Sequence, residues 1–107
     1  MKAQTYIKKD VVEKTIEKTG LDAKESARAV NAVFDSLREL MTEGPLECRI
    51  EIRNFGVFEV KRTAAKPKAR NPKKPDQVIY IPPRRKTLFR PGKILKNILK
   101  QPLDSLE

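Results

Sequence analysis

The chain has 107 residues, a formal net charge of +10 at pH 7, 6% aromatic residues and no tryptophan or histidine. A chain of this length predicts one small domain whose core cannot enclose an elaborate catalytic cavity, so we expect function on the surface. The absence of histidine removes the commonest general base and metal ligand, and the single cysteine, Cys48, excludes an intrachain disulfide. We therefore expect no enzyme activity, no metal and no cofactor.

Two amphipathic helices are predicted in the first half of the chain. Apolar residues recur at helical spacing over about 8–19, and Gly20 ends this helix. Asp22, with Glu25 three residues later, forms a capping box for a second helix that runs to about Thr42. Its apolar stripe is the strongest periodic signal in the sequence. The stripe consists of Ala27, Val30, Val33, Phe34, Leu37, Leu40 and Met41.

Strands are predicted beyond the Gly44-Pro45 stop, where the apolar period changes from 3.6 to 2. Cys48, Ile50 and Ile52 alternate with charged residues, then Phe58 and Val60 do so, and a third strand spans Val78 to Ile81 before Pro82-Pro83. Asn54 and Gly56 predict a tight turn or bulge around Phe55, because both residue types tolerate a positive φ.

The cations are concentrated in the second half of the chain. Residues 1–60 carry 10 Lys or Arg against 11 Asp or Glu, whereas residues 61–100 carry 14 against the single acid Asp76. This asymmetry favours a polyanionic partner, either nucleic acid or an anionic membrane surface, over a merely solvated basic face. Residues 61–74 contain seven cations, two prolines and no large apolar side chain. They cannot form a core, so we expect a protruding β-ribbon arm that enters a DNA groove.

The expected tip of the arm is Arg70-Asn71-Pro72. A proline offers a rigid apolar edge that can wedge between base pairs, while an adjacent arginine enters a narrow minor groove. The alternative is an ordinary turn, because Asn-Pro often begins turns. After the arm, Pro91 and Gly92 open a short helix in which Leu95, Ile98 and Leu99 should face inward, and residues 101–107 form a loose tail.

Three segments resemble the signature segments of the HU/IHF family of bacterial histone-like, nucleoid-associated DNA-binding proteins. They are Asn54-Phe55-Gly56-Val57-Phe58-Glu59-Val60, then Arg70-Asn71-Pro72, then Phe89-Arg90-Pro91-Gly92-Lys93. The resemblance spans about residues 8–100 and implies an α+β fold in an intertwined homodimer. It implies an α-helical base, a three-stranded antiparallel sheet per chain forming a saddle with a protruding arm, and a short C-terminal helix.

The resemblance also implies boundaries for one domain over residues 1–100. It places the helical dimerisation part at about 7–43, the sheet at about 46–60 and 78–90, the arm at about 61–77 and the last helix at about 91–100. Pro72 matches the intercalating proline, with Arg70 beside it. The other implied DNA contacts are Asn71, Lys61, Arg62, Lys66, Lys68, Lys73, Lys74, Arg84, Arg85, Lys86, Arg90, Lys93, Lys96, Arg53 and Lys8. The implied dimer core is Val30, Val33, Phe34, Leu37, Phe55, Phe58 and Phe89.

Three features depart from the family pattern. Lys74-Pro75 replaces the usual Thr-Gly after the tip, Ile7 stands where a capping Thr, Ser or Asn often begins the first helix, and residues 45–48 add length. The tip is therefore expected to be stiffer or differently shaped.

The implied function is architectural: the protein binds duplex DNA through the minor groove and bends or compacts it with low sequence specificity. A site-specific bending factor of the IHF kind is the first alternative, and a small RNA-binding protein of ribosomal type is the second. Membrane binding is disfavoured because the densest cations lack bulky apolar residues opposite them. Without a signal-like start or a long apolar stretch, we expect a cytoplasmic protein at the bacterial nucleoid, as a homodimer or paired with a paralogue.

Overall fold

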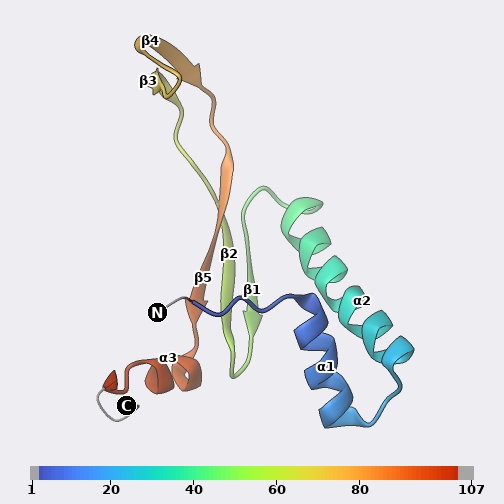
Figure 1. Ribbon diagram of the computed structural model, residues 1–107. Helices are drawn as coiled ribbons and strands as arrows, with labels where there is room; N and C mark the ends of the chain where they lie inside the picture. Colours follow the sequence, from blue (N-terminus) through green and yellow to red (C-terminus); the bar gives the residue numbers. More distant parts are fainter. Residues whose placement is uncertain (1–2, 104–107) are drawn as a thin grey trace. The chain divides into compact units, whose positions relative to one another are not determined.

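The computed structural model describes residues 3–103, so residues 104–107 of the expected tail lie outside the described residues. The chain divides into two compact units, Met1–Glu43 and Gly44–Glu107. The first contains α1 (Lys8–Thr19) and α2 (Ala23–Thr42), and the second contains five strands and the short helix α3 (Lys93–Leu99) (Figure 1). This is the α+β architecture that the sequence predicts.

The helix α1 begins without a hydroxyl or amide cap. Ile7 occupies the N-cap position, and its backbone N–H donates a hydrogen bond to Asp10 Oδ2 at 2.7 Å. The Asp10 N–H in turn donates to the Ile7 carbonyl oxygen at 2.9 Å. Asp10 thus supplies from inside the helix the side-chain bond that fixes the start of α1, in place of the capping Thr, Ser or Asn that is usual in the family.

The cap residues Gly20 and Asp22 lie where the sequence predicts them, but Asp22 and Glu25 form only one of the two hydrogen bonds of the predicted capping box. Gly20 ends α1 with φ 73°, in the left-handed region that favours glycine. The Asp22 carboxylate accepts a hydrogen bond from the Glu25 N–H at 2.7 Å and begins α2. Both helices therefore have the bounds predicted from sequence.

Much of the apolar stripe of α2 is accessible to solvent in the single chain. Ser26 and Val30 are the buried residues among those described in α2, whereas the side chains of Val33 and Phe34 are exposed. A helix with a strong apolar face normally buries that face. The single chain leaves this requirement incomplete.

An antiparallel sheet in the order β1-β2-β5 forms the body of the second unit, from β1 (Cys48–Ile52), β2 (Gly56–Arg62) and β5 (Arg85–Pro91). Ile50, Phe58 and Phe89 lie directly opposite one another across the three strands. The Phe58 and Phe89 ring centroids are 4.9 Å apart, and Phe55 lies 5.3 Å from Phe89. Such aromatic pairs each contribute about 0.5–1.5 kcal/mol beyond area burial.

The turn between β1 and β2 agrees with the prediction at one residue and corrects it at another. Asn54 has φ 65°, as expected for a residue that tolerates the left-handed region. Gly56 does not have a positive φ, so that expectation was wrong. Glycine is required there for close approach, since an added Cβ would lie 2.5 Å from the Arg90 carbonyl oxygen and 2.7 Å from the Phe89 ring.

The third strand of the body sheet is β5, which falls almost entirely within the 78–90 stretch that the family resemblance assigned to the sheet. The prediction from the apolar pattern that Val78 to Ile81 form this strand was wrong. Those residues belong to β4 (Lys74–Ile81), which pairs with β3 (Lys66–Asn71) in a separate two-stranded sheet. The adjacent apolar residues Leu88 and Phe89 break the period-2 pattern and concealed β5. The two-stranded part therefore covers residues 66–81, not 61–77; we call residues 66–81 the arm.

The C-terminal helix α3 follows β5 directly. Gly92 is its N-cap and donates a backbone hydrogen bond to the Phe55 carbonyl oxygen at 2.8 Å. Leu95 is half-buried, but Ile98 and Leu99 are exposed in the single chain. The expectation that all three face inward is therefore wrong for Ile98 and Leu99 within one chain.

Candidate nucleic-acid interface

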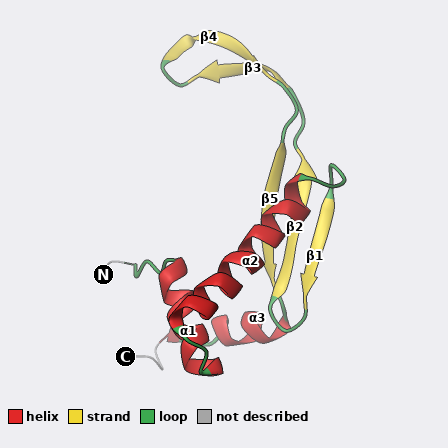
Figure 2. Cartoon of the chain, turned by 90° about the vertical axis from the view of Figure 1, so that its right-hand side faces the viewer, coloured by secondary structure: helices red, strands yellow, loops and turns green. Residues whose placement is uncertain are grey.

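The pairing of β2 with β5 continues into the arm without a change of register. Arg62 lies opposite Arg85 in the body sheet, and Lys66 lies opposite Ile81 in the arm, which is the same pairing frame. Figures 1 and 2 show β3 and β4 beyond the ends of β2 and β5, with short loops between them. One long ribbon thus runs from the body to the tip.

A proline pair interrupts this ribbon at the base of the arm. Pro82 and Pro83 lack backbone N–H groups and cannot donate to a strand partner. Just before the interruption, the Thr63 N–H donates to the Arg84 carbonyl oxygen at 2.8 Å, and the Arg84 N–H donates to Thr63 Oγ1 at 3.0 Å. The hydroxyl of Thr63 therefore completes the last pair where the regular ladder stops.

The tip of the arm is a tight turn with Pro72 exposed at its apex. Asn71 lies opposite Lys74, and the Lys73 N–H donates to Asn71 Oδ1 at 3.0 Å. This side-chain bond fixes the turn without a residue of positive φ. Because Arg70 pairs with Val78, residues 75–77 have no counterparts on β3 and form an irregularity beside the turn. The tip thus differs in shape from a simple two-residue hairpin, as Lys74-Pro75 suggested.

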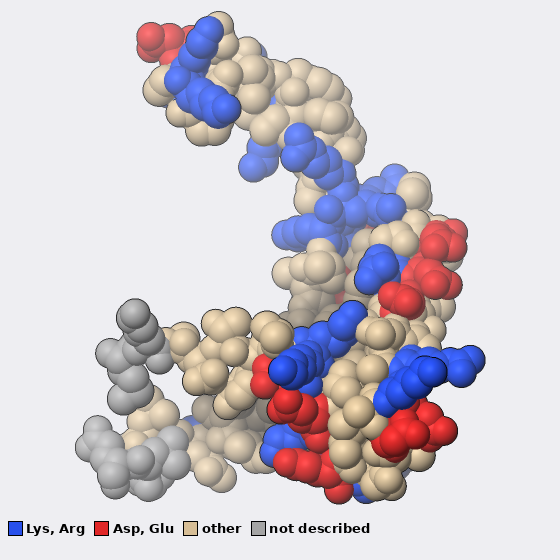
Figure 3. All heavy atoms as spheres, turned by 45° about the vertical axis from the view of Figure 1, so that its right-hand side comes forward, with Lys and Arg blue, Asp and Glu red and all other residues tan. Residues whose placement is uncertain are grey.

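The cations predicted to contact DNA lie mainly on the arm and at its base (Figure 3). Lys61 and Arg62 end β2, while Lys66, Lys68 and Arg70 lie on β3. Lys73 is in the tip turn, Lys74 begins β4, Arg84 precedes β5, and Arg85, Lys86 and Arg90 are on β5. Lys93 and Lys96 are on α3. Arg53 lies in the β1–β2 turn, and Lys8 begins α1 in the first unit.

Like charges lie directly opposite each other where β2 and β5 enter the arm. Lys61 pairs with Lys86 and Arg62 with Arg85 across the antiparallel ladder. Directly opposed like charges destabilise a sheet, since their Cβ atoms are only about 4.5–5.5 Å apart. Among the described residues from 61 to 100, Lys61 and Arg90 are the cations that form an ion pair, and both do so with Glu59. The arm and its base therefore carry a large uncompensated positive charge.

Glu59 lies on the charged face of the body sheet and was not identified as a site residue from sequence. Its carboxylate is 2.5 Å from Arg90 Nε and 3.6 Å from Lys61 Nζ, with 10% of its side chain exposed. Burial acts to raise the pKa of Glu59, but the hydrogen bond and charge of Arg90 and the charges of Lys61 and Arg49 outweigh it. The pKa therefore lies below its ordinary value, and Glu59 remains a carboxylate that orients two cations. Its place among cationic neighbours in β2 and β5 depends on strand register, which the sequence did not supply.

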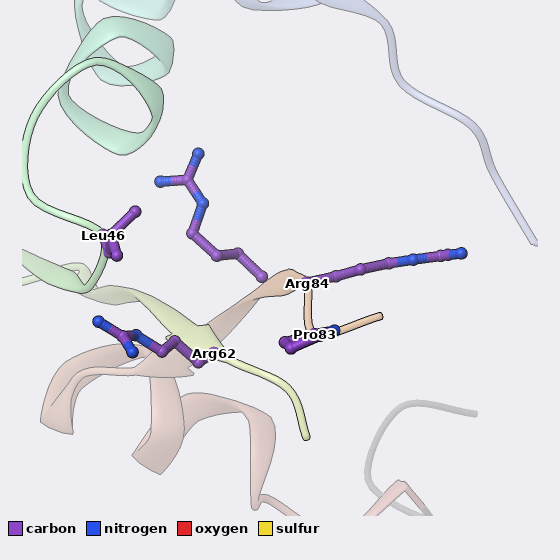
Figure 4. A pocket seen from close by; sticks show the side chains of 5 residues that line it. Leu46, Arg62, Pro83 and Arg84 are labelled. Atoms are coloured by element: carbon purple, nitrogen blue, oxygen red, sulfur yellow. The ribbon is translucent and has the colours of Figure 1, made fainter. Parts of the chain in front are cut away.

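The added residues before β1 pack beside the base of the arm. Arg62 lies on β2 past Val60, the residue that pairs with the first residue of β1. Its N–H donates to Glu47 Oε2 at 3.1 Å. Leu46, Pro83 and the arginines 62, 84 and 85 line a hollow at this point (Figure 4). The extra length thus supplies a side-chain acceptor for a backbone N–H of β2 that lies beyond the first residue of β1.

The residues expected in the dimer core fall into both units. Val30, Val33, Phe34 and Leu37 are on α2, whereas Phe55, Phe58 and Phe89 form the ring cluster of the sheet. Within residues 3–103, no helix is long and apolar enough to cross a membrane. In the same range, the Cys, Asp and Glu residues form no group of three or more that could hold a metal ion.

Comparisons with known proteins agree with this geometry. A sequence profile of the family described as "Bacterial DNA-binding protein" matches residues 6–100. The chain is 37% identical over 93 residues to DNA-binding protein HU of Geobacillus stearothermophilus, with 87% of this chain and 98% of that protein covered. It is 40% identical over 92 residues to integration host factor subunit alpha of Myxococcus xanthus, with 86% and 67% covered. The solved Anabaena HU-DNA cocrystal structure matches with a TM-score of 0.77 and 25% identity, over 91% of this chain and 100% of that one.

Proposed function

The chain belongs to the bacterial DNA-binding protein family, and we propose that it is an architectural protein that binds the minor groove of duplex DNA and bends or compacts it. It acts without catalysis, in the cytoplasm at the bacterial nucleoid. HU-like binding with low sequence specificity is the main form of this proposal. The family relatives and the geometry of the arm support it together.

The uncompensated charge of the arm is the observation that carries the proposal. Opposed pairs such as Arg62 and Arg85 cost folding free energy, and among the described residues neither of these two guanidinium groups forms an ion pair that would offset the cost. Phosphates bound along the ribbon would offset that cost and release counterions, so affinity should fall steeply with salt. These contacts position the protein on the duplex rather than select its sequence.

Pro72 is proposed as the wedge that unstacks a base step, with Arg70 in the minor groove. Its exposed position at the apex of the turn leaves its ring free of the protein interior. Unstacking costs a few kcal/mol per step and is offset by the contacts that bent DNA makes. Pro72→Ala should therefore leave the fold intact and reduce bending.

Energy transfer between dyes at the two ends of a short duplex tests the wedge. Pro75→Ala is the matched control, because Pro75 is also on the arm but lies outside the Pro72-Lys73 turn. The proposal expects less energy transfer for Pro72→Ala and wild-type transfer for the control. Equal bending by Pro72→Ala and the wild type would remove the wedge from the mechanism.

The protein is proposed to act as a homodimer, with a heterodimer as the alternative where a paralogue is present. The exposed apolar side chains of Val33 and Phe34 on α2 and of Ile98 and Leu99 on α3 favour burial against a second copy. Light scattering at micromolar concentration should give about twice the chain mass of 12.3 kDa. A value of 12.3 kDa would refute the dimer.

Site-specific bending is a second candidate, favoured by the similarity to integration host factor. A salt titration of binding to straight, nicked and four-way-junction DNA, each in several unrelated sequences, separates general architectural binding from recognition of one sequence. General architectural binding predicts a preference for the nicked and junction forms over straight DNA of any sequence, because deforming them costs less. Failure to bind all three at low salt would refute the proposed function.

A further inference from the structure

The arm carries exposed apolar side chains that its role as a cationic ribbon does not explain. Val78 and Tyr80 on β4 are 63% and 62% exposed. Ile79 and Ile81, which alternate with them on the same strand, are half-buried. Because successive side chains of a strand point to opposite faces, Val78 and Tyr80 lie together on one face and the two isoleucines on the other.

Two cations share the face of Val78 and Tyr80. Arg70 is directly opposite Val78. Lys66 pairs with Ile81 and Ala69 with Ile79, so Pro67 and Lys68 together face the single residue Tyr80 across a bulge. This face of the arm therefore consists of two apolar side chains on β4 beside two cationic side chains on β3. We call Lys68, Arg70, Val78 and Tyr80 the mixed face.

Resting on the proposed function, we propose that the mixed face is the surface of the arm that enters the minor groove, with Tyr80 a specific DNA-contacting residue. Lys68 suits the phosphates at the groove edge, whereas Arg70 enters the minor groove beside Pro72, as proposed above. The aromatic ring and Val78 suit the apolar deoxyribose surfaces that form the groove walls. Tyr80 then contributes affinity by burial of apolar surface, which depends little on salt, whereas Lys68 contributes through counterion release.

The dependence on salt separates the two contributions. Tyr80→Ala should weaken duplex binding by about tenfold at every salt concentration, the effect of partly burying an aromatic side chain. The slope of log affinity against log salt should stay at the wild-type value. Lys68→Gln should instead lower the magnitude of that slope by about 0.9 for each arm bound. Tyr80→Phe should bind like the wild type, and circular dichroism should show that each variant is folded.

Tyrosine fluorescence gives a direct test, since the chain has two tyrosines and no tryptophan. Tyr6→Phe leaves Tyr80 as the only strongly emitting residue. We expect acrylamide to quench Tyr80 in the unbound protein and far less after saturation with duplex DNA. The matched variant Tyr80→Phe, which retains Tyr6, controls for protection outside the arm.

Each result has a defined meaning. Suppose that the protein binds duplex DNA but that acrylamide quenches Tyr80 equally with and without DNA, or that Tyr80→Ala binds with wild-type affinity. Either result overturns this proposal and leaves the proposed function intact. Protection of Tyr80 that rises with protein concentration in the absence of DNA also overturns it, because the mixed face would then contact a second copy. If the wild type does not bind duplex DNA at all, the proposed function fails and this proposal fails with it.

Discussion

Removing the opposed arginines at the base of the arm should change stability and DNA affinity in opposite directions. Arg62 and Arg85 are directly opposite each other, and we expect both to contact phosphates. In Arg62→Gln/Arg85→Gln, the loss of two phosphate contacts per chain lowers the magnitude of the salt slope by about 1.8 per chain, or about 3.6 for a dimer. Relief of the repulsion raises the free energy of unfolding by about 0.2–1 kcal/mol at low salt.

Two measurements check this expectation. Fluorescence anisotropy with a labelled duplex at several salt concentrations gives the slope, and urea denaturation of both single variants and the double variant gives the coupling free energy. Each single variant already relieves the repulsion between the two arginines. The double variant should therefore show the same rise in the free energy of unfolding as a single variant, not the sum of the two. The gain should shrink at high salt, where the Debye length falls to about 3 Å at 1 M.

A variant with the same change in net charge controls for nonspecific effects. Lys14 and Arg38 form exposed ion pairs on α1 and α2 with Glu17 and Asp35. Lys14→Gln/Arg38→Gln should leave the salt slope close to that of the wild type. An equal loss of slope in the control and in the arm variant would show that net charge alone acts and would refute the phosphate contacts of Arg62 and Arg85. A coupling free energy of zero between the two arm substitutions would refute the repulsion across the strands.

The remaining predictions concern the body sheet. Gly56→Ala should lower the free energy of unfolding by about 1–3 kcal/mol in urea, because its Cβ would lie 2.5 Å from the Arg90 carbonyl oxygen; Gly44→Ala, with nothing within 4 Å of its Cβ, should cost far less. The lowered pKa of Glu59 means that its stabilising effect is complete above its ordinary value of 4.5 and is lost as pH falls through the folded-state pKa. The thermal midpoint of the wild type should therefore decline more steeply below pH 4.5 than that of Glu59→Gln, and parallel pH profiles would contradict this.

Local patterns in the sequence were sufficient to predict the helices, the start of the sheet and the position of the tip. The apolar period of residues 8–42, with the caps at Gly20 and Asp22, depends on contacts within one or two helical turns, so local pattern was sufficient. The alternation from Cys48 to Ile52 is equally local. The cationic composition of residues 61–74, without large apolar side chains, also predicted that this stretch leaves the core. In the structure the stretch covers the end of β2, β3 and the tip turn.

Which residues lie opposite one another in the sheets could not be predicted from such local patterns. The third strand is β5, and its identification required its pairing with β2, since its own pattern of apolar residues is not regular. Register also decided that Gly56 is needed for close approach to Phe89, that Glu59 lies between cations and that Tyr80 faces a bulge on β3. These facts depend on residues far apart in the chain, and a strand's local sequence does not specify the partner against which it is aligned.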